Sequence, residues 1–439
     1  MLLTLPSELT HEILSNLAGN VATLAACART CKALYPQSQI ILFSRVELHL
    51  HTSVLNLDWP QKDYFTKESK LLSILEQRPD LVPYIHNVSI YDLFGGEELI
   101  IADPELNSDV VQDLFGRNES ALLLLRLLKH TRSMKLFAYN TRSWKHLDPS
   151  IQLAIHDAFL TPDLESIDIY AMASFPVSLL EGCARTLKHL SINTFPTLRL
   201  GYDEALVSPN SKGMDPVQLA SLCLSTSTPD LERFVKWIPG SRLNLAQLSR
   251  LVVRTLGDKH KNVQPLVWKL VCECSATLKE LDFFAYLPHG RTDIKSDGVL
   301  SLYDTFDLGR VPALQKLTVR YWLSNVSDTN RQLTLLARLL RTMGGALKLE
   351  QLTLHFVIIH SRVPLDPTGP DAWKILDAII VETAPPSLCK VAVQFESIPD
   401  QQRQQAVEMV EEGLSNLKAR RILDIQSLSS SPRFIPFSR

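Results

Sequence analysis

The chain has 439 residues, 45 % hydrophobic and 21 % charged, which is ordinary for globular proteins and enough for about two or three domains. Lysine plus arginine number 45 and aspartate plus glutamate 47, so a net charge of −2 gives no general attraction to nucleic acid or acidic membranes, and we expect neither as a partner. Seven scattered cysteines indicate free thiols in a reducing compartment, the cytoplasm or the nucleus.

The first predicted element is a helix over residues 5–17, with Pro6 in its first turn and one apolar stripe at helical spacing. Two further apolar runs, over residues 21–25 and 27–35, are predicted to form a second and a third helix, the third ended by Pro36. Three helices within about 40 residues are too few to bury such a stripe by themselves. Either the rest of the chain or a second polypeptide must cover it.

This segment resembles an F-box, on the pattern Leu5-Pro6-x-Glu8-Leu9, Ile13-Leu14-x-x-Leu17, Leu24 and Thr30-Cys31-Lys32-x-Leu34. The resemblance implies an F-box over residues 1–50 that docks on the Skp-type adaptor of a cullin-based ubiquitin ligase. The adaptor contacts that it implies are Leu5, Pro6, Glu8, Leu9, Ile13, Leu14, Leu17, Leu24, Cys31 and Leu34. The alternative is an ordinary amphipathic helix that caps the next domain.

Residues 51–85 are predicted to be a helical linker, in which Leu71, Leu72 and Leu75 indicate a helix that connects the N-terminal helices to the next domain. The remainder, 86–426, is predicted to be one repetitive domain, followed by a flexible tail over 427–439. Long segments that contain glycine or proline interrupt this domain. They cover residues 92–118, which is locally acidic, 199–216, 287–312 and 358–371.

A six-residue phrase recurs in the repetitive part: leucine, two residues, an apolar residue, one residue, and a second apolar residue. Clear copies begin at Leu164, Leu187, Leu248, Leu278, Leu314, Leu349 and Leu388. Weaker copies lie over residues 46–50, 88–91, 134–139, 231–237 and 422–425. The alternation predicts a short half-buried strand in each copy, and helical patterns lie between the copies. We therefore expect an α/β fold in which repeated units stack as a solenoid, with parallel strands about 4.8 Å apart.

This array resembles the leucine-rich repeat family, which in F-box proteins commonly follows the F-box, especially in fungi. The repeat is irregular, since copies start 23 residues apart at Leu164 and Leu187 but 39 apart at Leu349 and Leu388. The asparagine position of the family holds other residues here, such as Phe195 and Trp322, so no asparagine ladder is expected. A non-repetitive α/β domain whose strands share a hydrophobic rhythm is the alternative.

The residues that alternate with the apolar pair should face outward together on one surface of the sheet. Their charges alternate in sign along the array, and aromatic side chains lie among them, which suits a protein ligand better than nucleic acid. The candidate substrate contacts are Asp168, Tyr170, Asn193, Arg250, Arg254, Asp282, Phe284, Lys316, Arg320 and His355.

No catalytic or metal-binding motif is complete. His11-Glu12 has Ser15 where a zinc-binding helix needs its second histidine, and His49 with His51 lacks further ligands. Cys272 and Cys274 lie about 200° apart around a predicted helix, so they do not share a metal, and Cys272 is expected to pack in the core. We expect a non-enzyme without cofactor or metal.

The resulting hypothesis is a substrate-receptor subunit of an SCF-type cullin ubiquitin ligase. Its partners would be a Skp-type adaptor, through it a cullin, and an unidentified protein substrate. The alternatives are an interaction scaffold that recruits no ligase, and an enzyme with a site that no known motif reveals.

Overall fold

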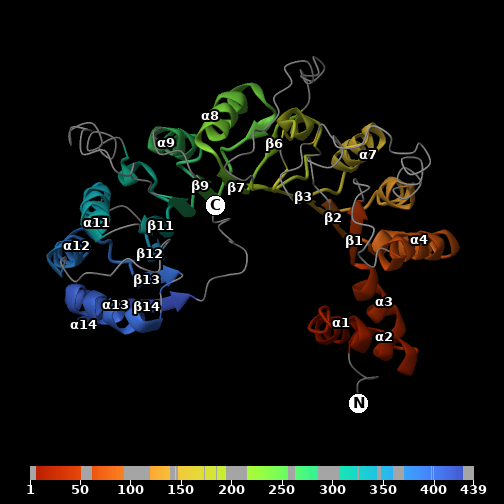
Figure 1. Ribbon diagram of the computed structural model, residues 1–439, viewed down its shortest axis with the longest axis horizontal. Helices are drawn as coiled ribbons and strands as arrows, with labels where there is room; N and C mark the ends of the chain where they lie inside the picture. Colours follow the sequence, from red (N-terminus) through yellow and green to blue (C-terminus); the bar gives the residue numbers. More distant parts are fainter. Residues whose placement is uncertain are drawn as a thin grey trace, which may run out of the picture. The chain divides into compact units, whose positions relative to one another are not determined.

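A computed structural model describes the chain, which divides into two compact units, Met1–Val217 and Gln218–Arg439 (Figure 1). The predicted boundaries near residues 50, 85 and 426 are finer and stay predictions. Leu5, His51 and most of the predicted interruptions and tail lie outside the described residues. These are 6–50, 62–92, 119–138, 144, 147–172, 174–183, 185–193, 215–255, 263–284, 306–323, 326–343, 348–358, 370–396, 398 and 400–428.

The first unit begins with three short helices, α1 (Ser7–Ser15), α2 (Val21–Thr30) and α3 (Tyr35–Phe43). The prediction of a third helix over residues 27–35 is wrong, because residues 27–30 end α2 and the chain then turns before α3. Pro36 lies in the first turn of α3 instead of ending a helix, since its missing N–H costs nothing there. The three helices enclose a small core.

The sheet of the first unit has five parallel strands, each paired with its neighbour in chain order. They are β1 (Arg45–Leu50), β2 (Asn87–Asp92), β3 (Ser133–Ala138), β4 (Ser166–Tyr170) and β5 (His189–Asn193). The other elements are α4 (Lys62–Gln77), η2 (Pro79–Tyr84), a helix over 119–127, α7 (Pro149–Phe159), η4 (Val177–Gly182) and, at the boundary of the units, β6 (Val217–Gln218).

Helix α4 covers the outer edge of this sheet. The Glu68 carboxylate is buried and accepts a hydrogen bond of 3.1 Å from the backbone N–H of His49 in β1. An edge strand otherwise exposes unpaired backbone groups that can pair with another chain. The predicted helix around Leu71 and Leu75 therefore forms, and it protects the edge of the sheet that follows α3.

The second unit repeats this arrangement with seven parallel strands, and α9, α11, α12 and α13 follow one another along one side of them (Figure 1). The strands are β7 (Ser221–Thr226), β9 (Arg250–Thr255), β10 (Glu280–Phe284), β11 (Lys316–Leu323), β12 (Gln351–Ile358), β13 (Lys390–Glu396) and β14 (Leu423–Leu428), with a short β8 (Leu243–Asn244). The helices are α8 (Thr228–Trp237), η7 (Ile238–Gly240), α9 (Gln264–Glu273), η8 (Leu308–Arg310), α11 (Val326–Arg341), α12 (Pro370–Thr383), α13 (Asp400–Gly413) and α14 (Ser415–Ala419).

The α/β class and the parallel pairing predicted from the repeated phrase are thereby confirmed. Every clear copy of the phrase contains a strand, and the strands pair so that equivalent phrase positions lie side by side. Along the second unit one such row of buried residues is Leu251, Leu281, Leu317, Leu352 and Val391.

Two predictions about copies of the phrase are wrong. Residues 231–237 form helix α8 instead of a strand, because Ser227 caps the helix and Pro229 lies in its first turn. A copy that the prediction missed, Leu219-Ala-Ser-Leu-Cys-Leu224, contains β7. The full pattern of the phrase is present in this missed copy. At residues 231–237 the error arose because a short apolar run alone does not distinguish a strand from a helix.

Hydroxyl groups take the place of the absent asparagine ladder. Thr186, Thr277 and Ser387 each lie directly before the first leucine of a phrase. Each donates a hydrogen bond to the carbonyl of the first leucine in the preceding copy, at 2.9, 3.0 and 2.9 Å respectively. Neighbouring turns are therefore tied to each other where the strands begin, which satisfies backbone groups that burial would otherwise leave unpaired.

The core of the second unit is aromatic near β12. The rings of Tyr321, Phe356 and Phe395 stack across three strands, and Trp373 of α12 packs edge-on against Phe356. A Cβ atom added at Gly413 of α13 would lie 2.3 Å from the Cβ of Trp373, so only glycine allows the two helices this approach. In the part of the chain that is described, none of the helices could cross a membrane by length and apolarity.

Candidate functional site

An apolar surface lies on the three N-terminal helices. Leu9 and Ile13 of α1, one turn apart, are 47 % and 45 % exposed, and Val21 of α2 and Tyr35 of α3 are exposed as well. Exposed large side chains of this kind cost solubility unless something covers them. We call Leu9, Ile13, Val21 and Tyr35 the N-terminal apolar surface.

The predicted adaptor contacts differ in how far their side chains are exposed. Pro6, Glu8, Leu9 and Ile13 are exposed, whereas Leu14 and Leu24 are only 4 % and 1 % exposed and form the core of the three helices with Ile41. The partly buried side chains of Leu17 and Leu34 pack against this core, and Cys31 is partly exposed. We therefore assign Leu14 and Leu24 to the folding of the helices, since a partner cannot reach them without unfolding.

Polar contacts tie α3 to the sheet. The Tyr35 hydroxyl lies 3.5 Å from the Arg78 guanidinium, which binds the Asp80 carboxylate through two hydrogen bonds of 2.9 and 2.7 Å. The carbonyl of Ser44, between α3 and β1, accepts from the backbone N–H groups of His86 and Asn87 at the start of β2. The three helices are thereby attached to the chain segment that leads into β2.

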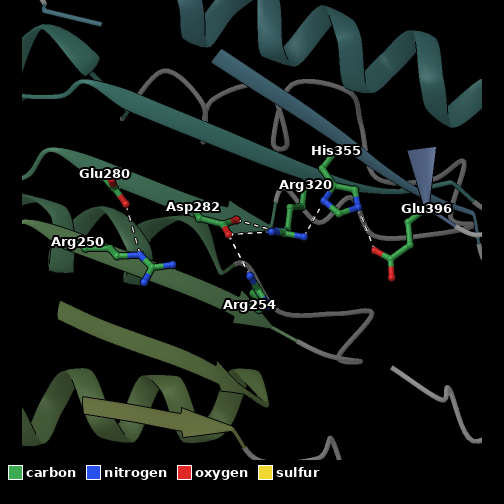
Figure 2. A network of polar contacts seen from close by, with 7 residues as sticks. All are labelled: Arg250, Arg254, Glu280, Asp282, Arg320, His355 and Glu396. Atoms are coloured by element: carbon green, nitrogen blue, oxygen red, sulfur yellow. Dashed lines mark hydrogen bonds and ion pairs between the residues drawn. The ribbon is translucent and has the colours of Figure 1, made fainter. Parts of the chain in front are cut away.

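The second candidate site is a network of charged side chains on the sheet of the second unit, on β9 to β13 (Figure 2). The Asp282 carboxylate lies at its centre. It accepts from Arg254 Nη2 at 3.1 Å and from Arg320 Nε and Nη2 at 2.7 and 2.9 Å. Burial alone would raise the pKa of Asp282, but Arg320 and Arg254 outweigh it and hold that pKa below its ordinary value.

His355 continues the network towards β13. Arg320 Nη1 lies 2.7 Å from His355 Nδ1, and because a guanidinium only donates, Nδ1 must be the acceptor. The ring proton is then on Nε2, which lies 2.9 Å from Glu396 Oε2. His355 in turn lowers the pKa of Glu396, against the smaller opposing effect of burial. Both ring nitrogens of His355 thus face charged side chains of neighbouring strands.

A second row of ion pairs lies nearer the start of the same strands. Glu280 Oε1 is 2.8 Å from Lys316 Nζ, and Glu280 Oε2 is 3.5 Å from Arg250 Nε. Lys390 forms a similar pair of 2.8 Å with Asp424. These side chains are much more exposed than Asp282 and Arg320, so water screens their attraction.

Five of the predicted substrate contacts form ion pairs within the sheet: Arg254 and Arg320 pair with Asp282, and Arg250 and Lys316 pair with Glu280. Two further predicted contacts are buried on the same face, Phe284 at 6 % exposure and His355 at 4 %. These contacts within the sheet compete with a ligand for the same side chains, and the expectation that they contact a substrate stays a prediction. Sequence reasoning missed Glu396, which becomes visible only once β12 and β13 are aligned.

The remaining predicted contacts lie on the sheet of the first unit. Asn193 Nδ2 donates to Ser191 Oγ at 2.8 Å and to Asp168 Oδ1 at 3.3 Å. Tyr170 ends a row of four rings, one from each of β1 to β4, with His49, Tyr91 and Phe137. Aligning the weaker copies of the phrase with the copy at Leu164 would have revealed this row, because each ring directly follows the second apolar residue of its copy.

The cysteine prediction is corrected as well. Val267, Leu270, Val271 and Cys274 make up the buried side of α9 and the turn after it, so Cys272 is exposed on the other side. Burial raises the pKa of the Cys274 thiol to about 12, which keeps it protonated and unreactive. No cluster of three or more histidine, cysteine or carboxylate side chains suited to a metal occurs within the described ranges.

No protein-family model matches this chain, and comparison with curated proteins finds no matching relative. The fold itself defines the chain as an α/β protein in which parallel strands pair with their neighbours in chain order.

Proposed function

We propose that this chain is a substrate-receptor subunit of an SCF-type cullin ubiquitin ligase, with its N-terminal helices as an F-box. The supporting observation is the exposure of Leu9 and Ile13, which are large, apolar and adjacent on α1, while the neighbouring Leu14 fills the core of the helices. An apolar pair that its own module leaves uncovered is what a docking surface for a Skp-type adaptor requires.

The remainder of the chain would hold the substrate, as a solenoid resembling leucine-rich repeats. Three observations support this interpretation: the strands pair in chain order, the phrase positions are in register, and the hydroxyl hydrogen bond repeats at Thr186, Thr277 and Ser387. The mechanism is proximity, because tethering a substrate next to the ubiquitin-transfer enzymes raises the local concentration of its lysines. No chemical step is assigned to this chain.

The test is co-purification of a Skp-type adaptor with the chain carrying Leu9→Asp and Ile13→Asp. We expect recovery of the adaptor to fall at least about tenfold, because a charge in a desolvated apolar contact is costly. Ile375→Asp is the matched control, since Ile375 of α12 is an apolar residue that is 56 % exposed. Unchanged recovery from the double variant, with a folded chain, would contradict the assignment.

Leu14→Asp is unsuited to this test, although Leu14 belongs to the same pattern. Its side chain is in the core with Leu24 and Ile41, so the variant would disrupt the three helices and lose any partner indirectly. If the wild-type chain binds no Skp-type adaptor, the alternative of an interaction scaffold without ligase recruitment replaces this proposal.

A further inference from the structure

The row of four rings on the first unit is the strongest feature that the adaptor assignment leaves unused. His49, Tyr91, Phe137 and Tyr170 lie at equivalent positions of adjacent strands. Successive ring centroids are 5.2, 4.9 and 5.7 Å apart, and the first three rings are nearly parallel. All four side chains are partly exposed. We call these residues the aromatic ladder.

Stacking decides which part of each ring a ligand can reach. The ring faces in the ladder pack against one another, so the edges of Tyr91 and Phe137 are what remains for other contacts. A cation binds the electron-rich face of an aromatic ring, so this geometry does not favour one. Ring edges carry a partial positive charge that suits carbonyl oxygens, and they also bury apolar area against aliphatic groups and proline rings.

The charged side chains around the ladder come in pairs of opposite sign. Arg45 pairs with Glu47 at 3.3 Å, and Lys135 lies opposite Asp168 on the neighbouring strand. The other partly exposed residues on this face are small hydroxyl and amide side chains, Ser133, Ser166, Ser191 and Asn193. Tyrosine among serine and asparagine is the composition that antibodies use to bind proteins, because rigid rings give area and small polar groups adapt their hydrogen bonds.

We propose that the aromatic ladder binds an uncharged, extended segment of a protein that contains aliphatic residues or proline. The ladder crosses four strands, a span that about five extended residues cover at ~3.3 Å each. Compensated charges on the surface match a segment without net charge, whereas an acidic or basic segment would lose hydration without gaining a partner. This inference rests on the proposed function and deepens it by naming the class of substrate segment.

The test selects short random peptides by display on the immobilised full-length chain, in the absence of any adaptor. Binding of the enriched peptides is then measured to the wild type and to Tyr91→Ser and Phe137→Ser. We expect uncharged sequences with aliphatic residues or proline, and affinities reduced at least about tenfold in each variant. Lys390→Ser, which changes a partly exposed side chain on the strand face of the second unit, is the matched control and should leave the affinities unchanged.

Circular dichroism of each variant shows whether the fold is retained, and Phe137→Tyr, which keeps the stack, should retain most of the binding. The proposal is overturned if no peptide is enriched, if the enriched peptides are charged, or if folded Tyr91→Ser and Phe137→Ser bind as the wild type does. Ladder-dependent binding of a neutral oligosaccharide in place of peptides would also overturn it. Because the adaptor is absent, these outcomes are independent of the test on Leu9 and Ile13.

Discussion

The strand faces of the two units carry different side chains at one equivalent position, the residue directly after the second apolar residue of the phrase. In β1 to β4 of the first unit this position holds the rings of the ladder, His49, Tyr91, Phe137 and Tyr170. In β9 to β12 of the second unit the same position holds Arg254, Phe284, Arg320 and His355. The backbone pairing is alike in the two units, so side-chain chemistry alone makes the difference.

That difference decides what each face can do. Arg320 uses its donors on Asp282 and His355, and His355 uses its second nitrogen on Glu396, so the groups at the centre of the second face bind one another. Opposite charges satisfied within a sheet stabilise a strand arrangement but leave little to offer a ligand. The first face keeps partly exposed rings and small polar groups. The contacts within the second face act mainly within the sheet, whereas the first face keeps side chains available for the recognition that we propose.

Removing the central carboxylate should break the second face most strongly. Asp282→Ala leaves Arg254 and Arg320 poorly hydrated and without the carboxylate that binds both of them, and we expect a loss of about 3 kcal/mol in the free energy of unfolding. Urea unfolding measures it. Glu280→Ala, on the same strand and the same face but more exposed, is the control and should cost less than about 1 kcal/mol. Equal losses in the two variants would contradict the distinction.

Acid should weaken the same network. The pKa values of Asp282 and Glu396 are lowered in the folded chain, so the unfolded chain binds their protons at higher pH. Their contribution to stability is full above the unfolded carboxyl pKa of about 4 and is lost as the pH falls through the lower folded values. Unfolding midpoints measured at several pH values should fall more steeply for the wild type than for Asp282→Asn with Glu396→Gln. Parallel curves would show that the network does not cause the acid sensitivity.

In the first unit, truncating a ring of the ladder should cost less stability. Phe137→Ala removes stacking against Tyr91 and Tyr170 and part of a partly exposed side chain, for which we expect a loss of about 1–2 kcal/mol. Thermal unfolding followed by circular dichroism measures the change. A loss as large as that of Asp282→Ala would mean that the ladder is mainly a stabilising element, like the network of the second unit.

The smallest effect should come from the outer row of ion pairs. Lys316→Ala removes a 2.8 Å contact with Glu280, both of whose side chains are well exposed, so we expect less than about 1 kcal/mol. The difference from the wild type should also shrink as salt is added, because screening acts on exposed charges. A large and salt-independent loss would place Lys316 with the buried network instead.

Much of the fold was predictable because it depends on local patterns. The phrase with two alternating apolar residues predicted the strands that follow Leu164, Leu187, Leu314 and Leu349, since a strand with one buried face needs that alternation. The stretch at residues 231–237 was mistaken for a strand because both periods fit a short run, and Ser227 and Pro229 were the signals that decided for a helix.

The sequence by itself determined the α/β class, the apolar row of the sheet and the apolar stripe of α1. Tertiary structure decided which members of the stripe remain exposed, because Leu14 and Leu9 look alike in the sequence and only packing against Leu24 and Ile41 separates them. It also decided that Arg320, His355 and Glu396 meet. Residues about 40 positions apart along the chain become neighbours only when parallel strands align. The attraction between their opposite charges is strong only at that short spatial distance.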